Sequence, residues 1–153
     1  MTTAVTIETI EAKHAEITKM IEELKAPKPT TYGIPEALIE LAPGEQYAGL
    51  VLDQDGEPLH HLILLPDLTS DLSWEKARSW AEEVGGELPT RQEQSLLFAN
   101  LKKHFEPQAY WSCEQHEEEP GWAWSQHFGY GGQTCHRESY GLRARAVRRL
   151  VIE

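Results

Sequence analysis

The segment LPTRQEQSLLFANLKKHF, residues 88–105, holds the strongest local signal in this sequence. Thr90 and Glu93 stand three residues apart just before an apolar run, which is the spacing of a capping box. In that motif each side chain accepts a hydrogen bond from the backbone N–H of the other residue. Leu96, Leu97 and Leu101 then recur on one helical face. The segment therefore predicts a helix that Thr90 caps and that buries its leucine face.

The preceding segment SWEKARSWAEEVGG, residues 73–86, predicts a second helix. Ser73 is a favoured N-cap residue, and the glycine pair at residues 85–86 ends the helical pattern. The apolar stripe with helical spacing consists of Trp74, Ala77, Ala81 and Val84. Two amphipathic helices thus follow one another in the chain.

Strand-like segments lie on both sides of these helices. YAGLVLD (47–53) and LHHLILL (59–65) flank an Asp-Gly pair, which suits a tight hairpin turn. Shorter strands are expected in AYWSCEQ (109–115), GWAWSQHF (121–128) and LRARAVRRLVI (142–152). Strands grouped before and after helices favour the α+β class, so we expect one α+β domain over residues 46–153.

The expected core follows from the alternation of side chains along a strand. Trp122 and Trp124 share one face, where we expect both to be buried, and the arginines of the last strand should point outward. The residues expected to line the core are Trp74, Trp80, Leu96, Leu97, Trp111, Trp122, Trp124, Ala144, Ala146 and Val147.

Residues 1–26 are expected to form an oligomerising helix, joined to the domain by a Pro-rich connector at residues 27–45. The a and d positions of its heptad pattern are Ile7, Ile10, His14, Ile17, Ile21 and Leu24. Because isoleucine at both positions favours three strands, we expect a homo-oligomer, a trimer being favoured and a dimer being the alternative. His14, the one polar seam residue, either sets the register or points to water. In the competing interpretation the helix packs on its own domain.

The composition narrows the classes of partner. The chain has 153 residues and a formal net charge of −11, and an acidic surface repels phosphate backbones, so we expect no direct nucleic-acid binding. No apolar run reaches about 18 residues, so no membrane partner is expected. The first residues lack the basic and apolar regions of a signal peptide, which favours a cytoplasmic location.

Five side chains suited to metal binding or nucleophilic catalysis lie near the C-terminus: Cys113, His116, His127, Cys135 and His136. Their spacing is not that of paired zinc ligands, and no nucleophile signature surrounds either cysteine. We therefore expect no metal site, no cofactor and no catalytic residue, with a metal- or thiol-dependent enzyme as the weaker alternative. Both cysteines are expected to be free thiols, with a disulfide as the other interpretation.

Four motifs in order, GGELPTRQEQSLLFANLK, YWSCEQH, AWSQHF and LRARAVRRL, resemble the phage and prophage branch of the "domain of unknown function 1566" family. The resemblance covers roughly residues 47–150. It implies a C-type-lectin-like fold, which formylglycine-generating enzymes and phage receptor-binding variable proteins also use. That fold has two helices flanking a small twisted antiparallel sheet, chain ends that lie close together, and long loops that present a binding face.

The chain departs from the functional motifs of these relatives. It has Glu119-Pro120-Gly121 where calcium-dependent lectins have Glu-Pro-Asn or Gln-Pro-Asp, and it lacks Trp-Asn-Asp. Cys113 and Cys135 are far apart in sequence, unlike the cysteine pair that binds copper in formylglycine-generating enzymes. Neither calcium-dependent sugar binding nor copper chemistry is therefore implied.

We expect a specific binding face in the aromatic-rich segment from Trp111 to Tyr140, because exposed aromatic and polar side chains on Gly-rich turns suit recognition. The residues expected to be exposed there and to bind the ligand are His116, Glu117, Gln126, His127, Tyr130, Gln133, His136, Arg137 and Tyr140. The expected function is a non-catalytic phage- or prophage-encoded binding protein, cytoplasmic in the host cell or virion-associated, with a protein or glycan partner. The alternative is an intracellular anti-defence inhibitor, similar to anti-CRISPR proteins, whose acidic surface blocks a basic nucleic-acid-binding groove of a host complex.

Overall fold

The computed structural model describes residues 4–153, which divide into two compact units. The first unit ends at Ile34 and the second runs from Pro35 to Glu153. The boundary lies inside the segment 27–45 that the sequence predicts as a connector, and residues 27–42 form neither helix nor strand. No helix or strand therefore lies between the N-terminal helix and the first strand of the second unit.

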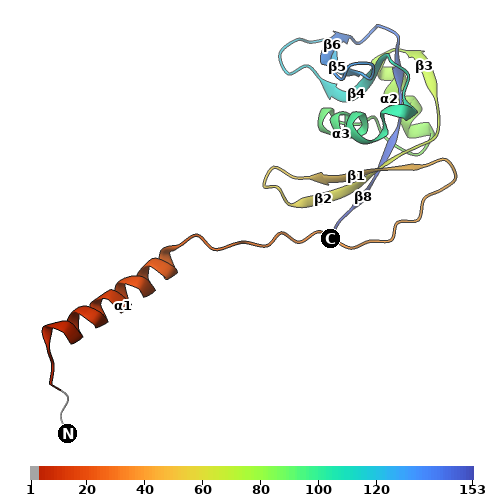
Figure 1. Cartoon of the computed structure of the whole chain (residues 1–153). Coiled ribbons are helices and arrows are strands. Elements are labelled where there is room, and N and C mark those ends of the chain that lie inside the picture. Colours follow the sequence, from red (N-terminus) through yellow and green to blue (C-terminus); the bar gives the residue numbers. More distant parts are fainter. Residues whose placement is uncertain (1–3) are drawn as a thin grey trace. The chain divides into compact units, whose positions relative to one another are not determined.

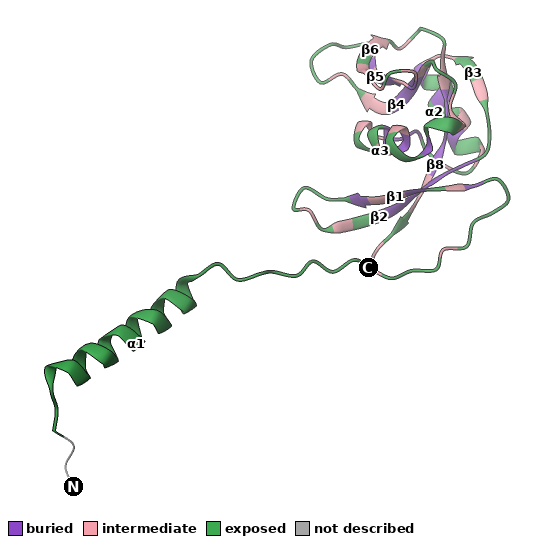
Figure 2. Ribbon diagram, in the orientation of Figure 1, coloured by how far each residue is buried: buried purple, intermediate pink, exposed green. Residues whose placement is uncertain are grey.

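Helix α1, Ile7–Lys25, is the one regular element described in the first unit (Figure 1). The Thr6 hydroxyl caps it by accepting a hydrogen bond from Thr9 N at 3.2 Å. None of its residues is buried, as the green helix in Figure 2 shows. Its seam isoleucines and leucine are between 45% and 74% exposed. The apolar seam predicted from the heptad pattern is therefore present and exposed.

The second unit contains two helices, one 3-10 helix and eight strands. The helices are α2 (Trp74–Glu83), α3 (Arg91–Leu101) and the 3-10 helix η1 (Lys102–His104). The strands are β1 (Gln46–Leu52), β2 (Pro58–Leu64), β3 (Thr69–Leu72), β4 (Ala109–Gln115), β5 (Trp122–His127), β6 (Gln133–Arg137), β7 (Leu142–Ala144) and β8 (Val147–Val151). The α+β class is confirmed, and both predicted helices begin at their predicted caps, Ser73 and Thr90.

The strands form two sheets, whereas the resemblance implies one. The three-stranded sheet has the order β1-β2-β8, so the first and last strands of this unit flank the same strand. The five-stranded sheet has the order β3-β7-β4-β5-β6. Its strand pairs are antiparallel except β4 and β7, which run parallel where Tyr110 pairs with Arg143. The expectation of a purely antiparallel sheet is therefore wrong at this pair.

Helices cover both faces of the five-stranded sheet. Helix α3 lies between the two sheets, in contact with β1 on one side and with β4 and β5 on the other (Figure 1). Tyr110 and Trp111 are neighbours in β4 and point to opposite faces. Tyr110 belongs to the core cluster that contains Leu97 of α3, and Trp111 to the cluster that contains Trp74 of α2. The five-stranded sheet thus has one helix packed on each face.

Most of the predicted core is buried: Trp74, Leu97, Trp111, Ala144, Ala146 and Val147. Trp80 and Leu96 are half-buried and pack against the two clusters. The prediction that Trp122 and Trp124 are core residues is wrong, because both are half-buried and Ala123 between them is fully buried instead. The indoles do share one face, but arginine side chains cover that face.

The predicted last strand is interrupted where the chain passes from the five-stranded to the three-stranded sheet. β7 ends at Ala144 and β8 begins at Val147. Arg145 lies in this break and is buried, so the prediction that the arginines point outward is wrong here. Its guanidinium donates hydrogen bonds to the carbonyl oxygens of His104 at 2.6 Å and Leu65 at 2.7 Å. The arginine thus fixes the crossover between the sheets.

Candidate functional site

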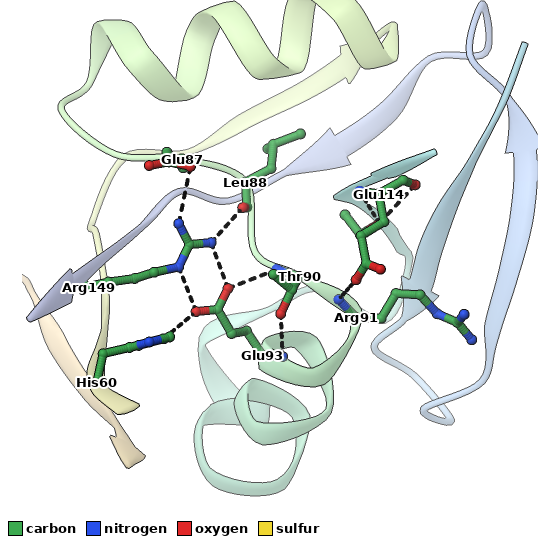
Figure 3. Close-up of polar contacts among 9 residues, drawn as sticks. His60, Glu87, Leu88, Thr90, Arg91, Glu93, Glu114 and Arg149 are labelled. Carbon is green, nitrogen blue, oxygen red and sulfur yellow. Dashed lines mark hydrogen bonds and ion pairs between the residues drawn. The ribbon is translucent and has the colours of Figure 1, made fainter. Parts of the chain in front are cut away.

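A buried ion-pair network fixes the start of α3 (Figure 3). Glu93 accepts hydrogen bonds from Arg149 of β8, from Nε to Oε2 at 2.8 Å and from Nη2 to Oε1 at 2.7 Å. His60 Nε2 lies 2.8 Å from Glu93 Oε2, and Arg149 Nη1 lies 3.1 Å from a carboxylate oxygen of Glu87. Burial tends to raise the pKa of Glu93, but the hydrogen bonds from Arg149 prevail and hold it below its ordinary value. The charged carboxylate therefore ties α3 to β2 and β8.

Three backbone N–H groups at the start of α3 donate hydrogen bonds to side-chain oxygen atoms of the same chain. Thr90 N donates to Glu93 Oε1 at 2.9 Å and Glu93 N donates to Thr90 Oγ1 at 3.1 Å, so the predicted capping box is confirmed. Arg91 N donates to Glu114 Oε2 at 2.6 Å (Figure 3). Because these groups are satisfied by two carboxylates and a hydroxyl, the helix start is not arranged to bind an anion.

The side chain of Arg91 is held over the indole of Trp124. Its guanidinium carbon lies 3.5 Å from the centre of the ring, which is a cation–π contact. Arg91 Nε donates to Gln133 Oε1 at 3.0 Å, and Gln133 Nε2 donates to the Arg91 carbonyl at 2.8 Å. Gln133 Nε2 also donates to Gln126 Oε1 at 2.8 Å. The guanidinium is thus oriented by the indole and by Gln133, while the Arg91 side chain keeps 34% exposure.

His116 and Glu117 extend this arrangement along the turn after β4. The imidazole of His116 stacks on Trp124, with the ring centres 5.5 Å apart and the planes at 15°. Its Nδ1 accepts hydrogen bonds from two backbone N–H groups of the turn, at 3.0 Å and 3.1 Å. The exposed carboxylate of Glu117 lies 3.9 Å from Arg91 Nη1. A positive and a negative group are therefore presented beside one indole.

A hollow of about 510 Å³ opens beside this group, and we call it the α3 hollow. It is lined by Thr90, Arg91, Gln92, Ser95, Glu114 and Gln133. The lining combines N–H and O–H donors with carboxylate and amide oxygens, and it contains no large apolar side chain. Such a surface matches a polar partner that both donates and accepts hydrogen bonds, such as sugar hydroxyls or a peptide backbone.

The nine predicted ligand-binding residues are divided between two faces of the sheet. In the β5–β6 register Gln126 pairs with Gln133 and Ala123 pairs with His136. Because side chains alternate along both strands, Gln133 points toward α3 and His136 points to the opposite face. Gln126 shares the α3 side but is only 1% exposed, so the expectation that it is exposed is wrong. Its Oε1 atom accepts the hydrogen bond from Gln133 Nε2 and so helps to orient Gln133.

Four of the predicted residues lie on the other face or at its rim. His127 stacks on Tyr130, with ring centres 4.2 Å apart, and Tyr130 is 72% exposed. The Nδ1 atom of His136 lies 2.9 Å from the hydroxyl of Ser125, and burial lowers the pKa of this histidine. Tyr140 is exposed, and its ring centre is 6.1 Å from that of His136. These residues do not reach the α3 hollow.

Arg137 and Trp122 form a third group. The guanidinium carbon of Arg137 lies 5.5 Å from the centre of the Trp122 ring. Both line a separate hollow of about 610 Å³, together with the carboxylates of Glu75 and Glu138. Trp122 pairs with Arg137 at one end of the β5–β6 ladder, whereas Gln133 pairs at the other end. The predicted ligand face is thus three separate surfaces.

The cysteines have the environment of structural thiols. Cys113 and Cys135 are free and half-buried. Burial raises the pKa of Cys113 to about 11, and burial also raises the pKa of Cys135. Nucleophilic attack and metal ligation both require the thiolate, which these environments disfavour.

Two further features of residues 4–153 bear on the predicted partners. No cluster of three or more His, Cys, Asp and Glu side chains in a single copy is arranged to hold a metal ion. None of the helices in the described part of the chain combines the length and apolar character needed to cross a membrane.

Several residues at the α3 hollow were not among the predicted ligand-binding residues: Arg91, Gln92, Ser95 and Glu114. Arg91 meets Trp124 and Gln133 only because α3 packs on β5 and β6, and no local spacing records that contact. One signal was available, because Arg91 lies between Thr90 and Glu93, which complete the capping box, and its own side chain is therefore not required to cap the helix.

No protein-family model matches this chain, and no curated protein matches its sequence. The resemblance to the phage and prophage branch described above therefore remains a prediction, and the site is interpreted from its own geometry.

Proposed function

We propose that this chain is a non-catalytic binding protein, encoded by a phage or prophage, that recognises a protein or glycan partner through the α3 hollow. The phage origin rests on the sequence resemblance. The C-type-lectin-like fold belongs to the same proposal, and it is supported by the helices on both faces of the sheet and by the adjacent first and last strands.

The observation that carries the proposal is the position of Arg91. Its guanidinium is oriented by Trp124 and Gln133 before any partner arrives, and it remains partly exposed at the edge of a polar hollow. Side chains that are already ordered lose less conformational entropy on binding, which favours affinity. Arginine is also enriched among the residues that contribute most of the binding energy at interfaces.

Helix α1 would supply multivalency. Its seam is exposed, and self-association of three copies would present three α3 hollows, each joined to the seam by a connector without helix or strand. Linked sites raise the effective affinity for a repetitive surface without any new contact. Such display suits a virion-associated protein, and it is equally compatible with the cytoplasm of the host cell.

Substitution of Arg91 tests the α3 hollow. Arg91→Gln removes the guanidinium and keeps the backbone N–H that Glu114 binds. Arg78→Gln is the matched control, because Arg78 also lies over an indole, 4.8 Å from the ring of Trp74, on a different helix. Binding to a glycan array and to an envelope preparation of the host bacterium should fall roughly tenfold or more for Arg91→Gln only. Equal binding by both variants would rule out this site.

One observation favours the second candidate, an inhibitor that blocks a basic groove of a host defence complex. Several arginines of the basic C-terminal segment are engaged internally: Arg145 is buried, Arg148 pairs with Glu45 and Arg149 pairs with Glu93. The C-terminal segment therefore presents less unpaired positive charge than its sequence suggests, so it interrupts the acidic surface less. Binding by charge would weaken steeply with salt.

A pull-down from host extract at low and high salt separates the two candidates. Retention of an envelope protein or glycan at both salt concentrations, lost in Arg91→Gln, supports the binding protein. A nucleic-acid-binding host complex that is released at high salt, and is captured equally by Arg91→Gln, supports the inhibitor instead.

A further inference from the structure

His14 interrupts an otherwise apolar seam on α1. Ile10 precedes it by four residues and Ile17 follows it by three, so an isoleucine lies about one helical turn away on each side. Within residues 4–153, Thr18 Oγ1 donates a hydrogen bond of 2.9 Å to the backbone carbonyl of His14, so this bond does not involve the imidazole. In this part of the chain the exposed imidazole has no recorded partner.

Further copies of the same helix fit this seam. A heptad pattern is complementary to itself, because the a and d side chains of one helix insert between those of another. Isoleucine at both positions favours three strands. A closed trimer of identical chains has threefold cyclic symmetry, which requires all three helices to run in the same direction. The same residue of each copy then lies at the same level around the axis.

Threefold symmetry brings the three copies of His14 together in one layer. An antiparallel pair would instead place each His14 against Ile17 of the other copy, so that two layers would each join a polar to an apolar side chain. The parallel arrangement confines the polar side chains to a single layer. Glu11 and Lys25 both occupy e positions of the heptad, where opposite charges of an antiparallel pair would attract, so that pair is the competitor that an experiment has to exclude.

We infer that this layer of three His14 imidazoles is a binding site for a divalent transition-metal ion. Imidazole suits zinc, copper and nickel, and three histidines are a known ligand set that leaves a further position for water. A single chain offers one of the three ligands, so the site exists only in the trimer. The inference rests on the self-association that the proposed function includes.

Metal binding would also account for a polar residue inside so short a seam. Helices of this length are marginally stable alone, and a polar residue at an a position lowers the stability of a coiled coil. A ligand that binds only the assembled state shifts the equilibrium toward assembly. The ion would therefore convert the weakest layer of the seam into one that holds the trimer together.

Cobalt(II) is the probe for this site, because its visible absorption reports coordination. The full chain is dialysed against Co²⁺ or EDTA, and its mass is measured by sedimentation equilibrium. His14→Ile replaces the ligand with the residue found at the other a positions, and His116→Gln is a control at an imidazole of the globular unit. We expect one Co²⁺ for every three wild-type or His116→Gln chains and none for His14→Ile. The concentration needed for trimer formation should fall roughly tenfold or more with Co²⁺ in the wild type only.

Each other result overturns the metal site. A trimer that binds no Co²⁺, or binds it equally in His14→Ile, refutes the His14 layer and leaves the assembly of the proposed function intact. A dimer with and without Co²⁺ also refutes it and indicates the antiparallel pair. A chain that stays monomeric in both conditions refutes the metal site and the multivalency together.

Discussion

Glu93 and Arg149 form a bidentate ion pair that joins the first turn of α3 to β8, the last strand of the chain. The two hydrogen bonds measure 2.8 Å and 2.7 Å. Glu93 also closes the capping box with Thr90, so one carboxylate both begins the helix and fixes it to β8. Arg91 belongs to the same turn, and its position over Trp124 therefore depends on this anchor.

Glu93→Gln should lower the free energy of unfolding by about 3 kcal/mol, because it removes the buried partner of a charged pair. Urea unfolding followed by tryptophan fluorescence measures the change. Glu87→Gln is the control, since Glu87 is an exposed partner of Arg149 at 3.1 Å and its loss should cost less than about 1 kcal/mol. Equal costs for the two variants would show that burial does not decide the strength of this network.

Stability should fall in acid through Glu93. Although burial opposes it, Arg149 holds the folded pKa of Glu93 below the ordinary value. A lowered folded pKa contributes stability that is complete above the unfolded pKa and is lost as the pH falls through the folded one. The free energy of unfolding of the wild type should therefore decline below about pH 4.3 more steeply than that of Glu93→Gln. Parallel pH profiles would contradict the assignment.

Trp111→Ala and Trp122→Ala should differ in cost, although the sequence places both residues in the core. Trp111 is fully buried, so its truncation should cost about 3–5 kcal/mol. Trp122 is half-buried beside Arg137, so its truncation should cost about 1–2 kcal/mol. Thermal unfolding of the two variants decides between these values. A larger loss of stability for Trp122→Ala than for Trp111→Ala would indicate that Trp122 is a core residue after all.

Native thiols should react slowly with iodoacetamide at pH 8. The pKa of Cys113 is raised to about 11 by burial and that of Cys135 is raised as well, so little thiolate is present. Mass spectrometry of the alkylated peptides should show both cysteines reacting more slowly than in urea, with Cys113 the slower. A native Cys113 that reacts faster than in urea would revive the thiol-enzyme alternative.

Local patterns predicted the elements of this fold, and long-range contacts determined the rest. Thr90 and Ser73 identified both helices, because capping depends on residues within one turn. The alternation that placed two indoles on one face could not show that Arg91 of α3 covers one of them. Arg145 was misplaced for a similar reason, since its carbonyl partners belong to segments distant in sequence.

The candidate site was predicted less well than the fold. Gln133 and His116 were expected to face a ligand and lie beside Arg91, whereas His136 was expected with them and lies on the other face. Composition can predict which segment of the chain binds a partner. The face of the sheet to which each of its side chains points depends on the strand register.

Sedimentation equilibrium of the full chain is the most direct test of the multivalent binding protein. We expect a mass three times the 17.4 kDa of one chain, and 17.4 kDa for a variant with Ile10→Asp and Ile17→Asp in the seam. Ala12→Asp with Lys19→Asp places the same residues, seven apart, on the outer face of the helix and should leave the trimer intact. A wild-type mass of 17.4 kDa, or equal masses for the two variants, would contradict assembly through α1.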